Sequence, residues 1–191
     1  NNQLALILGI KDQLRPNVKS ELLRLRKLGV KNLILLSGDN QGTVNQVAQN
    51  LRLTEAKGNM MPEDKAAYIT ELQKKGQNVT FVGDGVNDSP SLATANTGIA
   101  MGNGADVAID TSDIVLMNSD FDRLVPTLKL AKATSHNMLQ NIVIAVGVVV
   151  FLLTSLLFSS WLNMGIGMFV HEASILVVIL NAIRLLNYRL K

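Results

Sequence analysis

The sequence predicts a parallel α/β sheet followed by a pair of membrane-spanning helices. Over residues 1–136, short apolar runs alternate with amphipathic stretches, a pattern typical of a parallel sheet with helices on both faces. That part holds 29 of the 33 charged residues, whereas Glu172 is the sole formal charge within residues 137–183. A soluble domain of this size has too little interior to bury such a tail, so a water-soluble single domain is excluded as a description of the whole chain.

The elements of the soluble part follow from apolar runs and proline positions. Apolar, β-branched runs predict strands at residues 4–10, 33–36, 79–82, 98–101 and 114–117. Helices are expected at residues 18–28, 42–51, 63–74 and 89–95, and prolines at or just before the first turn support all of these starts except that at residue 42. A last helix, at about residues 121–136, is predicted to run into the first membrane helix without a break, as a mechanical connection.

The apolar tail has the length of a helical hairpin in a membrane. Residues 141–158 are uncharged, and their extension to Trp161 gives about 32 Å of helix, which matches a hydrocarbon core of about 30 Å. A soluble α/β unit at 1–136 and a hairpin at 137–188 are therefore predicted, with helices at about 138–160 and 163–186. Basic residues before and after the pair predict that both ends are cytoplasmic. A buried soluble hairpin is the alternative, but the first 136 residues offer little to cover it.

Composition excludes several classes of function. The net charge is only +3 and no dense basic run occurs, so no nucleic-acid partner is expected. The chain has no cysteine, which excludes disulfide scaffolds and thiolate metal sites within these residues.

The most distinctive polar cluster follows the strand expected at residues 79–82. Residues 83–90 read Gly-Asp-Gly-Val-Asn-Asp-Ser-Pro, and Asp84 and Asp88 lie four residues apart on a strand-to-helix turn. Two such carboxylates suit a hard cation such as Mg2+ that holds a phosphate, and the glycines allow close backbone approach. The same residues are also ordinary turn and helix-cap chemistry, so this cluster alone leaves both interpretations open.

Two weaker clusters accompany it. Residues 37–40, Ser-Gly-Asp-Asn, put a hydroxyl and free backbone amides at a helix start, which is the usual anion site but also a common way for helices to begin. Residues 61–65, Met-Pro-Glu-Asp-Lys, open the next helix. Lys65 would direct a cation at a phosphoryl group, although a lone lysine on a helix is usually solvated.

In this order, the three clusters resemble the C-terminal half of the phosphorylation domain of P-type ATPases, which has a haloacid-dehalogenase-like Rossmannoid fold. The resemblance extends to Asp-Gln-Leu-Arg-Pro at residues 12–16 and to Asn-Ala-Ile-Arg-Leu-Leu at residues 181–186. The closing helix pair is similar to that of the heavy-metal (type IB) branch. This resemblance implies ATP-driven export of a divalent cation through an aspartyl-phosphate intermediate, with ATP and Mg2+ as cofactors, by a multi-pass translocase of the cell membrane.

The resemblance also implies roles for individual residues. Asp84 and Asp88 would hold Mg2+, the Ser37 hydroxyl would bind phosphoryl oxygens where the family more often has Thr, and Lys65 would offset phosphoryl charge. The implied catalytic residues are Ser37, Gly38, Asp39, Lys65 and Asn87. These roles agree with phosphoryl transfer driven by positioning and electrostatics.

One element of the family pattern is missing from these residues. The phosphoryl-acceptor Asp of the Asp-Lys-Thr-Gly-Thr motif does not occur, nor do the nucleotide-binding and actuator domains, and we expect all of them upstream of Asn1. The polypeptide alone is therefore expected not to hydrolyse ATP. Two alternatives remain open, a membrane-anchored phosphatase of the same fold and a non-catalytic membrane pseudoenzyme.

The candidate site for the transported cation lies in the second apolar segment. His171 and Glu172 are ionisable groups near its middle, where burial is costly and function is the default interpretation. Imidazole and carboxylate suit borderline divalent ions of the zinc, iron, cobalt or cadmium class, and Ser174 lies one turn on from His171. Within the family, His-Glu-Ala-Ser resembles the signature of the cobalt/iron/zinc subgroup, with Ala173 in place of Gly. An interhelical hydrogen-bonded pair without a transport role is the alternative.

Overall fold

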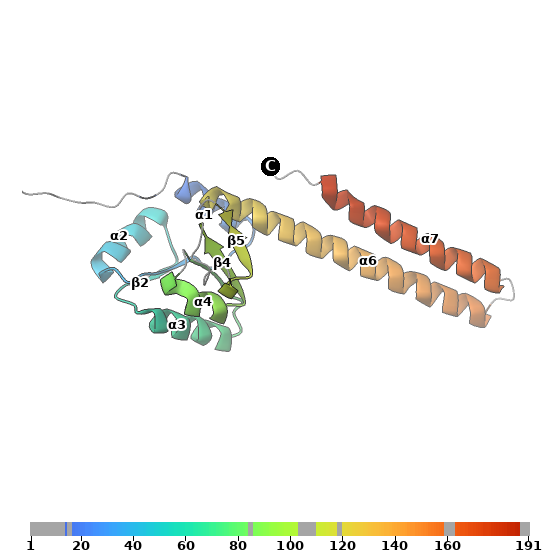
Figure 1. Cartoon of the computed structure of the whole chain (residues 1–191), viewed down its shortest axis with the longest axis horizontal. Helices are drawn as coiled ribbons and strands as arrows, with labels where there is room; N and C mark the ends of the chain where they lie inside the picture. The colour runs from blue at the N-terminus through green and yellow to red at the C-terminus, as the bar shows by residue number, and fades with distance from the viewer. Residues whose placement is uncertain are drawn as a thin grey trace, which may run out of the picture. The chain divides into compact units, whose positions relative to one another are not determined.

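The computed structural model describes Leu14 and residues 17–83, 86–102, 110–117, 120–158 and 163–187. The predicted strand at residues 4–10 therefore lies outside the described residues, as do Asp84 and most of residues 12–16. The chain forms two compact units, Asn1–Val125 and Pro126–Lys191, and each is described by itself (Figure 1). The first is a parallel α/β region, and the second consists of two long apolar helices.

Every strand pair among the described residues is parallel. One sheet pairs β1 (Ile34–Leu36) with β2 (Glu55–Lys57), and the other has the order β3 (Thr80–Gly83), β4 (Thr97–Met101) and β5 (Ile114–Leu116). Parallel strands need long crossover connections, and helices supply those from β1 to β2 and from β3 to β4. The predicted parallel sheet is therefore confirmed, and the four predicted strands that fall in the described residues differ from the observed ones by one residue at either end.

Strand β2 was not predicted from the sequence. Its residues, Glu-Ala-Lys, form no apolar run, and within the described residues it pairs only with β1, where Leu35 lies opposite Ala56. Short, charged strands are common at sheet edges, where tertiary hydrogen bonds rather than apolar burial fix the strand.

The helices of this unit begin where local caps direct them. They are α1 (Val18–Lys27), α2 (Gln41–Leu51), α3 (Pro62–Lys74) and α4 (Ser89–Thr94). Asn40 accepts a hydrogen bond from the Thr43 amide before α2, and Asp64 accepts one from the Met61 amide before α3. Proline occupies the first turn of both α3 and α4, where its missing N–H costs nothing.

The core of the first unit lies between α4 and the β3–β4–β5 sheet. Leu92 and Ala100 are each 1% exposed, and Phe81 and Val115 pack against them. Gly98 permits this close packing, because a Cβ there would lie 2.5 Å from the Leu92 carbonyl oxygen. The sheet therefore fixes the position of α4, and with it the 3-10 turn η1 (Val86–Asp88) that directly precedes α4.

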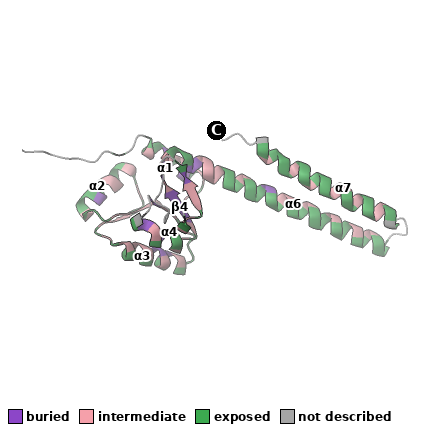
Figure 2. Cartoon of the chain, in the orientation of Figure 1, coloured by how far each residue is buried: buried purple, intermediate pink, exposed green. Residues whose placement is uncertain are grey.

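The second unit is a pair of long helices. After a 3-10 turn at Phe121–Arg123, α6 runs for 35 residues over Leu124–Phe158, and α7 (Met164–Ile183) is followed by a 3-10 turn, Arg184–Asn187. Both helices are long and apolar enough to cross a membrane, by length and composition, and most of their surface is exposed (Figure 2). α6 passes through residue 136 without a break, as expected for a mechanical connection, while the predicted boundary at 136/137 stays a prediction.

Candidate functional site

An ion pair joins two of the three polar clusters. The Nζ atom of Lys65, in the first turn of α3, lies 2.8 Å from Oδ1 of Asp88, at the end of the 3-10 turn η1 (Val86–Asp88). Each of the two side chains is only 13% exposed. Lys65 is therefore not the solvated lysine that is usual on a helix. Its charge is withdrawn from water and directed at the segment that follows β3.

Glycine at the end of β3 makes room for this carboxylate. A Cβ on Gly83 would lie 2.8 Å from both Cβ and Oδ2 of Asp88, which is closer than a real side chain approaches. The Asp88 carboxylate therefore rests directly on the strand end. Asn87 is described and exposed, whereas Asp84, the other predicted Mg2+ ligand, lies outside the described residues.

The cluster after β1 is organised by its own hydrogen bonds. The Ser37 hydroxyl donates to Oδ2 of Asp39 at 3.0 Å and accepts from the Asp39 amide at 3.2 Å. Ser37 is half-buried, while Gly38 and Asp39 are exposed just before α2 begins. The arrangement presents a hydroxyl, exposed backbone and a helix N-terminus together, which is the chemistry that binds anionic oxygens.

Backbone hydrogen bonds tie this loop to the loop that leads into α3. The Met60 amide donates to the Ser37 carbonyl at 3.0 Å, and the Asn59 amide donates to the Asp39 carbonyl at 2.7 Å. Because residues 58–60 lead through Pro62 to Lys65, the Ser37 loop and the Lys65 helix are parts of one frame.

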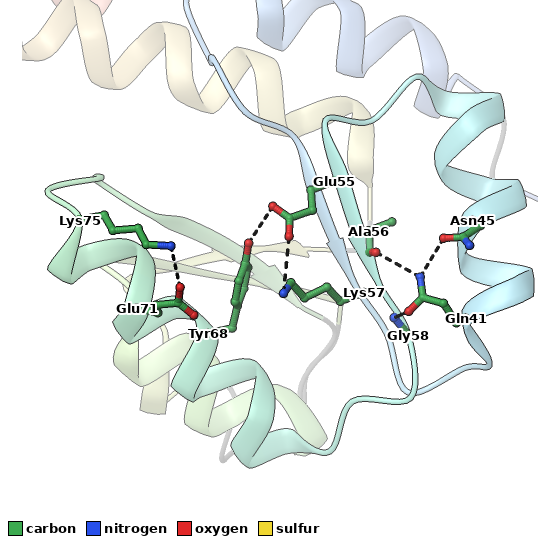
Figure 3. A network of polar contacts seen from close by, with 9 residues as sticks. All are labelled: Gln41, Asn45, Glu55, Ala56, Lys57, Gly58, Tyr68, Glu71 and Lys75. Carbon is green, nitrogen blue, oxygen red and sulfur yellow. Dashed lines mark hydrogen bonds and ion pairs between the residues drawn. The ribbon is translucent and has the colours of Figure 1, made fainter.

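Gln41, which the sequence analysis did not single out, strengthens the same frame. Its Oε1 accepts from the Gly58 amide at 2.7 Å, and its Nε2 donates to the Ala56 carbonyl at 3.2 Å (Figure 3). Its position directly after Ser-Gly-Asp-Asn, at the first residue of α2, was the signal available in the sequence. Its partners, however, lie on β2 (Ala56) and directly after it (Gly58), and that strand was not predicted.

A second network anchors α3 against β2. The Tyr68 hydroxyl donates to Glu55 at 2.8 Å, and the Lys57 ammonium lies 4.3 Å from the Tyr68 ring centroid (Figure 3). Burial, together with the hydrogen bond and the negative charge of Glu55, raises the pKa of Tyr68 to about 12. The tyrosine therefore stays neutral and donating at physiological pH, and holds the helix that carries Lys65.

The candidate cation residues all lie on α7. His171 and Glu172 are exposed in this unit, and Ser174 is half-buried and donates its hydroxyl to the His171 carbonyl at 2.6 Å. Within the described part of the chain, no three His, Cys, Asp or Glu side chains gather as a metal site would need. The two exposed groups point away from the half-buried face of the helix, so any further ligands would come from outside the described hairpin.

Comparisons with known proteins extend over both units. A family model for haloacid dehalogenase-like hydrolases matches residues 2–96. The chain is 36% identical over 184 residues to the cadmium-transporting ATPase of Staphylococcus aureus, covering 96% of this chain and 25% of that protein. It is also 36% identical over 187 residues to the zinc-transporting ATPase of Bacillus subtilis strain 168, covering 98% of this chain and 29% of that protein.

A solved structure is similar over nearly the same extent. The crystal structure of a zinc-transporting PIB-type ATPase in the E2.Pi state matches with a TM-score of 0.83 and 38% identity, over 92% of this chain and 28% of that one. The chain spans about a quarter of the length of the curated relatives it matches. With its parallel α/β unit, its three polar clusters and its two apolar helices, the chain belongs to the heavy-metal (type IB) P-type ATPases, as a C-terminal portion made of the haloacid-dehalogenase-like phosphorylation region and the helices that follow it.

Proposed function

We propose that this chain supplies part of the phosphoryl-transfer site and part of the cation path of a pump that exports a divalent heavy-metal cation at the expense of ATP, through an aspartyl-phosphate intermediate. The observation that carries the proposal is the desolvated Lys65–Asp88 pair at the end of β3, at 2.8 Å. A desolvated lysine at a helix start is suited to a phosphoryl group, because the helix dipole adds to its positive charge.

The residues around this pair have complementary tasks. Lys65 offsets negative charge on the phosphoryl oxygens, and the Ser37 hydroxyl and nearby amides bind the same oxygens. The frame through residues 58–60 holds the two groups at a fixed separation, so that they act together without reorganising. Asn87, exposed beside Asp88, is in a position to contact the phosphate.

The donor set fits Mg2+. Hard divalent cations prefer carboxylate oxygens, and the missing side chain of Gly83 leaves room for the Asp88 carboxylate at the strand end. Asp88 together with Asp84 would hold the ion, which when bound supplies positive charge that offsets the phosphoryl oxygens. The acceptor Asp and the ATP-binding surface belong, in this proposal, to further parts of the pump.

The cation path is proposed to run beside α7. His171, Glu172 and Ser174 offer nitrogen and oxygen donors, and relatives are named as transporters of cadmium and zinc, which supports a divalent metal of that class. Two helices of membrane-crossing length support a location in the lipid bilayer of the cell membrane, with the soluble unit and the C-terminus cytoplasmic. α6 runs from Leu124 to Phe158 as one helix and would transmit the phosphorylation state.

Phosphorylation by inorganic phosphate tests the phosphate half of this proposal. In a complete transporter that carries this sequence, we expect Lys65→Met to lower the phosphoenzyme formed from phosphate and Mg2+ at least tenfold. Lys74→Met is the matched control, because Lys74 is an exposed lysine at the end of the same helix. Equal phosphoenzyme levels in Lys65→Met and the unmodified protein would overturn the proposed role.

The same preparation separates the pump from its rivals. A pump hydrolyses ATP only when the transported metal is added, whereas a membrane-anchored phosphatase of this fold would hydrolyse a simple phosphate ester whether or not that metal is present. A pseudoenzyme would form no phosphoenzyme. Either of these two results would replace the proposed function.

A further inference from the structure

A cluster of asparagines joins the two long helices. Asn137 is 7% exposed, although it lies on a helix whose surface is otherwise largely open. Its Nδ2 donates to the Asn181 carbonyl of α7 at 2.8 Å, and its Oδ1 accepts from Nδ2 of Asn141 at 3.2 Å. Asn181 Nδ2 in turn donates to Asn141 Oδ1 at 2.8 Å. These three residues, the asparagine clamp, form a closed set of hydrogen bonds between α6 and α7.

Two further contacts complete the polar set. Arg184 Nη1 donates to Asn181 Oδ1 at 2.8 Å, so this side-chain oxygen has a charged donor. The Asn181 carbonyl is one of the last four of α7, and the Arg184 amide also donates to it. The clamp therefore caps the end of α7 as well as binding it to α6.

The clamp specifies one register of the helix pair. Half-buried positions on the two helices recur at matching distances from it: Ile144 and Val178 lie three residues from Asn141 and Asn181, and Val148 and Ser174 lie seven. This is the spacing of a heptad seam, in which a single polar layer selects the register because any other alignment leaves it without partners. In an apolar surrounding, hydrogen bonds between helices are favoured over unpaired amides.

The register decides where the candidate cation residues lie. With Asn141 opposite Asn181, the half-buried Ser174 faces Val148, and the exposed His171 and Glu172 lie off the seam, at angles that the register fixes. A slip of one residue would move α7 by about 1.5 Å and rotate the contact face by about 100°, which would turn Ser174 off the seam.

We propose that Asn137, Asn141 and Asn181 are positioning residues for cation binding: they fix the register and rotation of α7 on α6, and so the direction in which His171 and Glu172 point. The effect on cation binding rests on the proposed function. The register of α7 on α6 does not, because it follows from the hydrogen bonds alone. α6 continues to Leu124, so the clamp is also the point at which a movement of α6 passes to α7.

Crosslinking tests the register directly. In the complete transporter, Ile144→Cys with Val178→Cys is expected to react with a short thiol crosslinker, whereas Val148→Cys with Val178→Cys, one turn out of register, is expected to react much less. This chain contains no cysteine, so it contributes no other thiol that could react with the crosslinker. Introducing Asn141→Ala or Asn181→Ala is expected to lower the ratio of the first crosslink to the second at least threefold. An unchanged ratio in both variants would overturn the clamp.

Metal dependence tests the positioning. Asn141→Ala and Asn181→Ala are expected to raise the metal concentration for half-maximal phosphorylation by ATP at least threefold, while phosphorylation by inorganic phosphate without metal is retained. Asn163→Ala is the matched control, because Asn163 caps α7 by accepting from the Ile166 amide at 2.9 Å and has no place in the clamp. Its metal dependence is expected to match the unmodified protein. A lowered crosslink ratio with unchanged metal dependence would overturn the positioning role.

The two experiments also separate the failure of the inference from the failure of the proposed function. If the unmodified protein showed no metal-dependent phosphorylation, the proposed function would fail, but the crosslink ratio would still decide the register.

Discussion

Replacing Gly58 by alanine should disturb the frame that holds the phosphate site. An added Cβ would lie 2.7 Å from the Asp39 carbonyl oxygen, 2.8 Å from Gln41 Cα and 2.9 Å from Gln41 N. All three are backbone atoms, so no side chain can rotate away. Gly58 is not among the glycines with a positive φ, and the backbone conformation itself would accept alanine. The clash alone therefore determines the effect.

The size of the displacement follows from these distances. Ordinary contact of a Cβ begins at 3.4 Å, so the 2.7 Å approach to Asp39 requires a movement of about 0.7 Å. The hydrogen bond from the Asn59 amide to the Asp39 carbonyl, 2.7 Å long, involves the residue next to Gly58 and the same carbonyl oxygen, so this movement would strain it. Overpacking of this kind costs about 1–3 kcal/mol of stability. A misplacement approaching 1 Å can lower catalysis by about 10²-fold.

Two measurements on the complete transporter check this expectation. Gly58→Ala should lower the unfolding midpoint and should reduce phosphoenzyme formation from inorganic phosphate by about one to two orders of magnitude. Gly42→Ala is the control, because its Cβ would meet no backbone atom and only Oδ1 of the Asn40 side chain, at 3.3 Å, within a helix that favours alanine. If Gly58→Ala unfolds and phosphorylates like the unmodified protein, the Ser37 and Lys65 loops do not form one frame.

Two further predictions concern the polar contacts of the first unit. Lys65→Ala should cost about 3 kcal/mol, because it leaves the Asp88 carboxylate buried without its partner, and Asp88→Asn in the same chain should recover part of that loss in a double-mutant cycle by urea unfolding. The raised pKa of Tyr68 means that the folded state keeps a proton that the unfolded state has lost between pH 10 and about 12. The contribution of Tyr68 to the free energy of unfolding is complete below pH 10 and falls as pH rises through 12, by at most about 3 kcal/mol. If the stability of a Tyr68→Phe chain declined equally over that interval, the assignment would be contradicted.

The apolar parts of the fold could be predicted from the sequence. Strands β1, β3, β4 and β5 contain apolar or β-branched runs, and the length of α6 and α7 follows from uncharged stretches that only a long helix accommodates. Helix starts were predicted because prolines and short polar caps are local signals.

The contacts of the candidate site could not be predicted, because they depend on tertiary structure. Lys65 and Asp88 are 23 residues apart in the chain, and their pairing requires α3 and η1 to meet above the end of β3. β2 carries no apolar signal, so Gln41 and Tyr68, whose partners lie on or beside β2, were missed with it. The asparagines of the clamp were visible as polar residues in apolar segments, but their significance depends on the register.

The relation between metal binding and phosphorylation tests the central claim most directly. In a complete transporter that carries this sequence, phosphoenzyme is measured from ATP with and without added divalent metal, and from inorganic phosphate without it. His171→Ala and Glu172→Ala are expected to abolish the metal-dependent signal from ATP, because they remove donors of the proposed cation site. Phosphorylation by inorganic phosphate is expected to persist, because neither variant changes a residue of the proposed phosphate site. Retention of the full metal dependence in both variants would contradict the claim that this chain joins a phosphate site to a heavy-metal path.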